Sequence, residues 1–172
     1  MDGVSASPLV LGIDPGLRVC GWGLIRGGAR PAYGGCGTIK PKTSESVEKR
    51  LLHLHTLISQ IIETYRPDEL AIEDPFVGGL NPSSALAIGQ ARAVAMLAAA
   101  QHGIEVSLYA PTAVKAAVSG YGQSDKRQVQ TMIRMLLSLD AAPEPADAAD
   151  ALAVALTHLS HRKLRAMERA AR

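Results

Sequence analysis

The sequence lacks several features that would assign it directly to a class of protein. It has only two cysteines in 172 residues, Cys20 and Cys36, and no metal-binding spacing of cysteine and histidine. Two cysteines do not make a disulfide framework, so we expect free thiols and a reducing compartment. The N-terminus has no basic start followed by a long apolar segment, and we therefore expect no signal peptide.

The chain also lacks a strong net charge and a long apolar run. A formal net charge of only +2 does not by itself indicate a nucleic-acid partner. Residues 162–172 hold five basic residues against one acidic residue, a balance of +4, so the rest of the chain carries −2. A solvated basic tail is the simpler interpretation. The apolar run after Arg92 ends at Gln101, short of the ~20 residues that span a bilayer. We expect a cytoplasmic protein with no membrane partner.

The residues that are present predict one α/β domain. Apolar residues make up 47% and charged residues 20%, as in an ordinary globular protein. Short apolar runs between proline and glycine predict strands, and apolar residues at helical spacing predict helices. The expected strands are two segments within 9–25, then 31–39, 69–73 and 104–109, and the expected helices are 44–65, 82–101, 111–118, 124–139 and 145–161. We expect a single domain over residues 1–161 and a basic tail over 162–172.

Four carboxylates are candidates for a metal site. Asp14 ends the first strand, Glu73 ends the fourth, and Asp147 and Asp150 lie three apart on one face of the last helix. Each has a simpler explanation: a turn for Asp-Pro-Gly, a solvated strand end, and complementation of the helix dipole. If all four converge, they repel one another unless cations neutralise them, and oxygen ligands suit Mg²⁺ or Mn²⁺. Two such ions can clamp a phosphoryl displacement.

Four segments closely resemble the RuvC family of bacterial Holliday junction resolvases. They are I-D-P-G, A-I-E-D-P-F, S-A-L-A-I-G-Q-A-R and A-D-A-A-D-A-L-A-V-A-L-T-H, in family order within residues 8–161. The resemblance implies a ribonuclease-H-like fold with a mixed five-stranded sheet flanked by helices. It places the family's four metal-binding acids on Asp14, Glu73, Asp147 and Asp150, with two Mg²⁺ (or Mn²⁺) ions per active site. It further implies a homodimer that makes paired nicks in four-way DNA junctions during recombination and repair.

Three further residues gain roles from this resemblance. Lys115 and Lys126 match family lysines near the DNA and the active site, and Lys126 would steady developing charge as a catalytic residue. We expect Ser124 to cap its helix, which would place Lys126 beside free backbone amides that can hold a phosphate. Phe76, the only phenylalanine, matches a family aromatic thought to stack at the junction. Without the resemblance, solvated lysines and a core phenylalanine would be the better interpretation.

The helix over 82–101 is rich in small residues, which permit either a core neighbour or a second subunit to approach closely. The resemblance favours a subunit interface. His158 lies eight residues after Asp150, which is ~12 Å along a helix, so we do not expect it to bind the same ion. The resemblance also implies the RuvA and RuvB branch-migration complex as a partner.

The sequence departs from the family pattern at two places. Asp74-Pro75 replaces a Gln-centred pair after Glu73. Relatives often carry lysine in the region occupied here by Gly78, Gly79, Leu80 and Ala87. Fewer charges there would weaken the salt-dependent attraction to phosphates, for which the basic tail could compensate. Neither departure touches the four acids.

The reaction expected of such a resolvase is hydrolysis that leaves a 5′-phosphate and a 3′-hydroxyl. Two other functions are alternatives to it. The chain could be a junction-binding protein that no longer cuts, although its intact acids argue against this. It could also be a nucleotide-binding protein of the actin and sugar-kinase type, whose first hairpin carries a similar acid-and-glycine turn. Such proteins generally need two related halves, and this chain has room for one.

Overall fold

The computed structural model describes residues 7–75 and 79–170. Its elements follow the order expected from the sequence. The strands are β1 (Leu9–Asp14), β2 (Cys20–Arg26), β3 (Ala32–Ile39), β4 (Glu69–Glu73) and β5 (Glu105–Tyr109), and the helices are α1 (Val47–Tyr65), α2 (Pro82–Gln101), α3 (Pro111–Ser119), α4 (Lys126–Leu136) and α5 (Ala146–Ala170).

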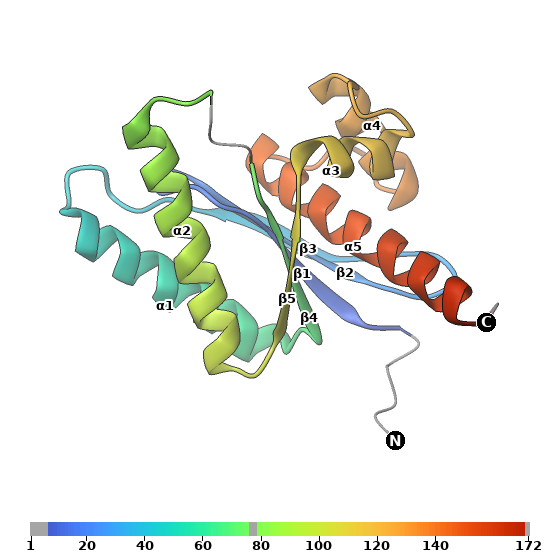
Figure 1. Cartoon of the computed structure of the whole chain (residues 1–172), viewed down its shortest axis with the longest axis horizontal. Coiled ribbons are helices and arrows are strands. Elements are labelled where there is room, and N and C mark those ends of the chain that lie inside the picture. Colours follow the sequence, from blue (N-terminus) through green and yellow to red (C-terminus); the bar gives the residue numbers. More distant parts are fainter. Residues whose placement is uncertain (1–6, 76–78, 171–172) are drawn as a thin grey trace.

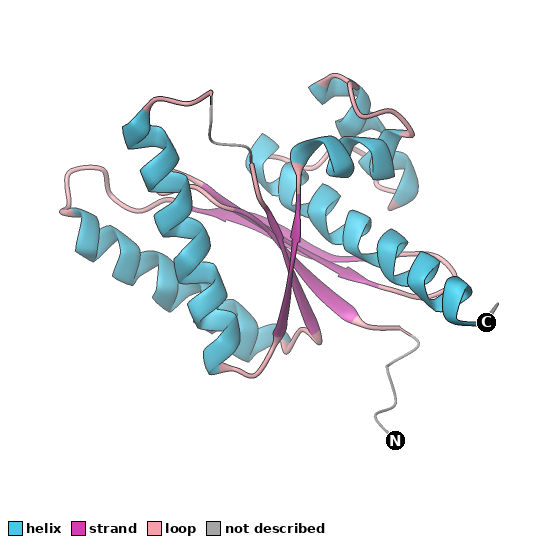
Figure 2. Ribbon diagram, in the orientation of Figure 1, coloured by secondary structure: helices cyan, strands magenta, loops and turns pink. Residues whose placement is uncertain are grey.

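The strands form one mixed sheet in the order β3-β2-β1-β4-β5. The first three strands pair antiparallel, as consecutive strands of a meander, whereas β4 and β5 run parallel to β1. Helices α1 and α2 cover one face, and α5 lies across the other with α3 and α4 beside it (Figure 1; Figure 2). The carboxyl ends of β1 and β4 therefore lie side by side at one edge of the sheet, where open α/β sheets place their ligands.

Helix α5 lies unusually close to the sheet because glycines replace side chains beneath it. A Cβ atom at Gly12 would overlap the carbonyl oxygen of Ala151, and one at Gly21 would overlap that of Asp147. At Gly23 it would meet the side chain of Leu152 at 2.8 Å. These strand glycines allow the backbone of α5 to rest directly on β1 and β2, which brings the start of the helix to the end of β1.

Several helix boundaries differ from those expected, including the end of α4 at Leu136 instead of residue 139. Helix α1 begins at Val47 with Ser46 as its N-cap, slightly later than the expected start at 44. The N-cap of α4 is Asp125 and not Ser124. Asp125 accepts a hydrogen bond from the Gln128 amide (2.8 Å), and the Gln128 side chain accepts one from the Asp125 amide (3.0 Å), which forms a capping box.

Helix α5 does not end at residue 161, as expected, but continues to Ala170. The described part of the predicted basic tail, residues 162–170, is therefore an extension of this helix. Arg162 explains part of the extension, because its Nε donates a 2.9 Å hydrogen bond to the Glu69 carboxylate and so ties the helix to β4. The sequence pattern alone showed no apolar stripe that would have required a helix beyond residue 161.

Candidate active site

The strand pairing brings Asp14 and Glu73 to the same edge of the sheet. Ile13 of β1 pairs with Ile72 of β4 in parallel register, so the residues that follow them are neighbours. Ala71 packs in the core on the α5 side of β4, and because side chains alternate along a strand, Glu73 faces α5 as well. The start of α5, with Asp147 and Asp150, lies over this edge.

The four acids interact electrostatically. The pKa of Asp14 is raised from 3.8 to about 7, first by burial and then by the negative charges of Glu73, Asp150 and Asp147. Burial followed by the charge of Asp150 also raises the pKa of Glu73. The structure therefore brings together all four carboxylates predicted from the sequence, in a setting that disfavours their simultaneous ionisation.

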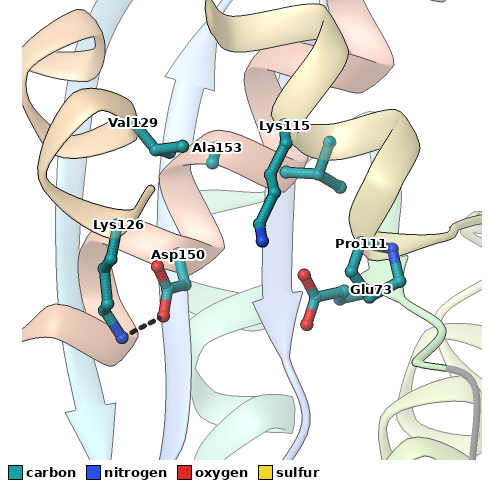
Figure 3. A pocket seen from close by; sticks show the side chains of 8 residues that line it. Glu73, Pro111, Lys115, Lys126, Val129, Asp150 and Ala153 are labelled. Atoms are coloured by element: carbon teal, nitrogen blue, oxygen red, sulfur yellow. Dashed lines mark hydrogen bonds and ion pairs between the residues drawn. The ribbon is translucent and has the colours of Figure 1, made fainter. Parts of the chain in front are cut away.

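Both predicted lysines lie at the same site. Glu73, Asp150, Lys115 and Lys126 line a pocket of about 220 Å³, and their charged groups point into it (Figure 3). Lys126 Nζ donates a 3.0 Å hydrogen bond to Asp150 Oδ2, and this bond raises the pKa of Lys126. The charges of Lys115 and Lys126 act in the opposite direction on Glu73 and lower its pKa.

The chemistry of these groups fits a divalent cation. Carboxylate oxygens are the ligands that Mg²⁺ and Mn²⁺ prefer. Within residues 7–75 and 79–170, no three histidine, cysteine, aspartate or glutamate side chains are already arranged as a metal centre. Burial and the charges of Glu73, Asp150 and Asp147 nevertheless raise the pKa of Asp14, and the opposing charge of Lys126 does not cancel the rise. A divalent cation would supply the missing positive charge.

The structure gives Asp74 a partner that the sequence did not reveal. The Asp74 carboxylate forms an ion pair with the guanidinium of Arg92 on α2, and its backbone amide donates a 2.8 Å hydrogen bond to the Tyr109 carbonyl. The departure at Asp74 thus introduces a fifth carboxylate beside Glu73 whose charge is matched from within the chain. An acid and a base 18 residues apart gave no signal of this pairing.

Two other residues considered in the sequence analysis are not found with the four acids. Phe76 falls outside the described residues, as does Gly78. His158 contacts Glu69, at the other end of β4 from Glu73, and the Tyr109 hydroxyl, and it takes no part in the acid cluster, in agreement with its distance along the helix.

We expect the metal-free protein to lose stability as Asp14 ionises. A carboxyl group whose folded pKa lies above its unfolded pKa stabilises the fold below about pH 4, and this contribution is lost as the pH rises through about 7. Each pKa unit is worth ~1.4 kcal/mol, so the loss amounts to a few kcal/mol. In urea unfolding with chelator, Asp14→Asn should therefore stabilise the protein relative to the wild type by more at pH 8 than at pH 5. Asp140→Asn, at an exposed carboxylate, serves as the control. A stability difference independent of pH would contradict the expected pKa.

Comparison with known proteins assigns the chain to a family. The family model described as crossover junction endodeoxyribonuclease RuvC matches residues 10–158. The RuvC proteins of Azorhizobium caulinodans and Xanthobacter autotrophicus are 48% and 50% identical to this chain, each over 94% of it and 95% of the relative.

Solved structures give the same result. The structure of T. thermophilus RuvC in complex with a Holliday junction substrate superposes with a TM-score of 0.87 at 32% identity, over 92% of this chain and 96% of that one. The yeast mitochondrial Holliday junction resolvase Ydc2 shares the fold at a TM-score of 0.67 and 12% identity, over 90% of this chain and 78% of that one. The ribonuclease-H-like α/β fold predicted from the sequence is confirmed, and the chain belongs to the RuvC family of crossover junction endodeoxyribonucleases.

Proposed function

We propose that this chain resolves four-way DNA junctions by metal-dependent hydrolysis of phosphodiester bonds. The observation that carries the proposal is the convergence of Asp14, Glu73, Asp147 and Asp150 at the edge formed by β1 and β4, where burial and the charges of the other three acids raise the pKa of Asp14. Membership in the RuvC family supports a junction as the substrate. A protein that only binds junctions would have no need for this costly cluster of charge.

The four acids would hold two Mg²⁺ ions, or Mn²⁺ in their place. Such ions, when bound, activate a water and stabilise the charge that develops on the scissile phosphate during in-line attack. The raised pKa of Asp14 means that it must lose a proton before it can act as a ligand.

The two lysines would bind the substrate beside these acids. Lys126 is the first residue of α4, and its ammonium group already lies in the pocket with Asp150. Lys115 lines the same pocket from α3. Together they would hold phosphate oxygens and steady the developing charge. We also expect Phe76 to contact the junction, as its match to the family implies.

This function is tested by comparing a synthetic four-way junction with a linear duplex of the same sequence. We expect the wild type with Mg²⁺ to nick the junction alone, and chelator to abolish the nicks. Asp14→Asn should lower the cleavage rate at least ~1,000-fold, because several kcal/mol of charge stabilisation would be lost. Junction binding should persist, since removal of a negative charge does not weaken contacts to phosphates. Cleavage by Asp14→Asn at the wild-type rate would refute the proposed metal site.

Helix α2 supports a homodimer. One side packs on α1, where Ala91, Ala95, Ala98 and Ala99 are buried. Leu86 and Leu97 remain 63% and 54% exposed, and among the described helices only α2 is long and apolar enough, by length and composition alone, to cross a membrane. A second subunit would cover this exposed face. Two sites related by a two-fold axis would then make paired nicks in opposed strands.

The dimer is tested by Leu97→Glu. A charge buried without a partner at an interface costs several kcal/mol, so we expect association to weaken at least ~100-fold. Analytical ultracentrifugation should show a monomer and the cleavage assay a loss of paired nicks. Met135→Glu, 63% exposed on α4 across the sheet, is the matched control and should remain dimeric. An unchanged dimer for Leu97→Glu would place the interface elsewhere.

A RuvA and RuvB branch-migration complex, in the bacterial cytoplasm, is the further partner that we propose from the family resemblance. The basic extension of α5 would contribute to DNA attraction where the lysines of relatives are missing.

A further inference from the structure

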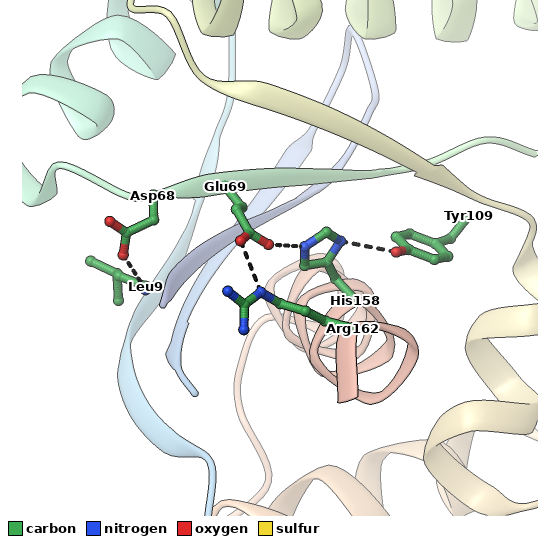
Figure 4. A network of polar contacts seen from close by, with 6 residues as sticks. All are labelled: Leu9, Asp68, Glu69, Tyr109, His158 and Arg162. Atoms are coloured by element: carbon green, nitrogen blue, oxygen red, sulfur yellow. Dashed lines mark hydrogen bonds and ion pairs between the residues drawn. The ribbon is translucent and has the colours of Figure 1, made fainter. Parts of the chain in front are cut away.

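A second polar cluster joins the middle of α5 to the start of β4, the end of that strand opposite Glu73. His158 is only 3% exposed, and its imidazole lies between Tyr109 and Glu69 (Figure 4). Because a carboxylate only accepts hydrogen bonds, Nε2 of His158 donates to Glu69, and in the neutral ring Nδ1 accepts from the Tyr109 hydroxyl at 2.9 Å. Arg162 Nε donates to the other oxygen of Glu69 at 2.9 Å.

This cluster connects the helix and the strand that carry the candidate metal ligands. Glu69 is the first residue of β4 and Glu73 the last, and both face α5. His158 and Asp150 lie on the same helix, eight residues apart. Four residues of strand span ~13 Å and eight residues of helix span ~12 Å. Because the two spans match, pairing His158 with Glu69 places Asp150 opposite Glu73.

The remainder of the helix–sheet contact includes apolar packing, in which Val10 and Ile25 of the sheet share a buried cluster with Leu152 and Leu156 of α5. Beneath α5, Gly12, Gly21 and Gly23 present backbone without side chains, and Ala71 is the residue of β4 between the two glutamates. These small residues set how closely α5 approaches the sheet. The hydrogen bond between His158 and Glu69 adds to this packing a directional contact between one residue of the helix and one of the strand.

The strands at this end are themselves held in register. The Asp68 carboxylate accepts a 2.7 Å hydrogen bond from the Leu9 amide, and the Asp68 amide donates one of 2.8 Å to the Leu9 carbonyl. The start of β4 is thereby fixed to the start of β1, the strand that ends in Asp14. Tyr109 reaches the other end as well, because its carbonyl accepts the hydrogen bond from the Asp74 amide.

We propose that Glu69 and His158, supported by Tyr109 and Arg162, are positioning residues that set the place of α5 along β4 and so the separation of Asp150 from Glu73. The proposal rests on the proposed metal site. One residue of slide moves a helix by ~1.5 Å, which is enough to spoil the geometry that Mg²⁺ demands. Positioning thus acts on metal affinity before any substrate binds.

The test is a titration of Mn²⁺ into the full-length protein without DNA, with free Mn²⁺ followed by electron paramagnetic resonance. Glu69→Thr suits a strand but cannot reach His158. Contacts that orient metal ligands directly are worth 10–100-fold in affinity, and for this more remote contact we expect a loss of about 3- to 10-fold. Glu69→Gln, which keeps an acceptor oxygen at the same reach, should bind Mn²⁺ more tightly than Glu69→Thr.

Glu105→Thr is the matched control. Glu105 of β5 pairs with Glu69 of β4, and its side chain is exposed. Both glutamates line a pocket of about 290 Å³. Its replacement removes the same charge from the same place, so we expect Mn²⁺ affinity within twofold of the wild type. An equal loss of Mn²⁺ affinity in Glu69→Thr and Glu105→Thr would mean that removal of a distant negative charge explains the effect, and it would overturn the proposal.

A second variant separates positioning from stability. The double variant Glu69→Leu/His158→Leu removes both partners of the buried contact, which costs less stability than leaving either of the two unpaired, although the Tyr109 hydroxyl and Arg162 each lose one hydrogen bond. At a temperature where it is fully folded, it should show the same weakened Mn²⁺ binding as Glu69→Thr. A lower melting temperature with wild-type Mn²⁺ affinity would show a merely structural role and overturn the proposal. Absence of Asp14-dependent Mn²⁺ binding in the wild type would instead refute the metal site, and the positioning role with it.

Discussion

Close contact between α5 and the sheet is the constraint on which the rest of the structure depends. Gly12 and Gly21 leave no room for a Cβ atom, so the carbonyl groups of α5 lie directly against β1 and β2. This approach forces Asp147 and Asp150 toward Asp14, where burial and mutual repulsion raise the pKa of Asp14 to about 7. The cluster of negative charge therefore destabilises the fold, which is typical of a site that binds cations.

The surroundings of the four acids partly offset this charge. Lys126 pairs with Asp150 within the pocket. The charge of Lys115, a residue of α3, opposes the rise in the pKa of Glu73. Arg92 neutralises Asp74, the fifth carboxylate, on the side of the sheet that faces α2. Since α2 is also the proposed subunit interface, the residue after Glu73 is anchored to the element that would join the two active sites. The lysines line the candidate active site, whereas the arginine supports the scaffold.

Local signals in the sequence predicted most of the fold, and they failed where contacts between distant residues decide. Proline, glycine and apolar spacing gave all ten elements in their correct order. They missed the Asp125 cap of α4, where an aspartate followed three residues later by glutamine was the available signal. They also missed the extension of α5, which Glu69 helps to hold through Arg162. The spacing of the four acids did not show that they converge, and only the resemblance to a family did so. The pairs Asp74–Arg92 and Glu69–His158 join residues far apart in sequence and had no pattern by which to be found.

The central claim is that the four acids form one site for divalent cations, and it is tested most directly by anomalous diffraction from crystals of the protein soaked in Mn²⁺. The account predicts two anomalous peaks between the start of α5 and the ends of β1 and β4, within bonding distance of carboxylate oxygens of Asp14, Glu73, Asp147 and Asp150. Peaks confined to other positions, or no peak in contact with Asp14, would contradict it.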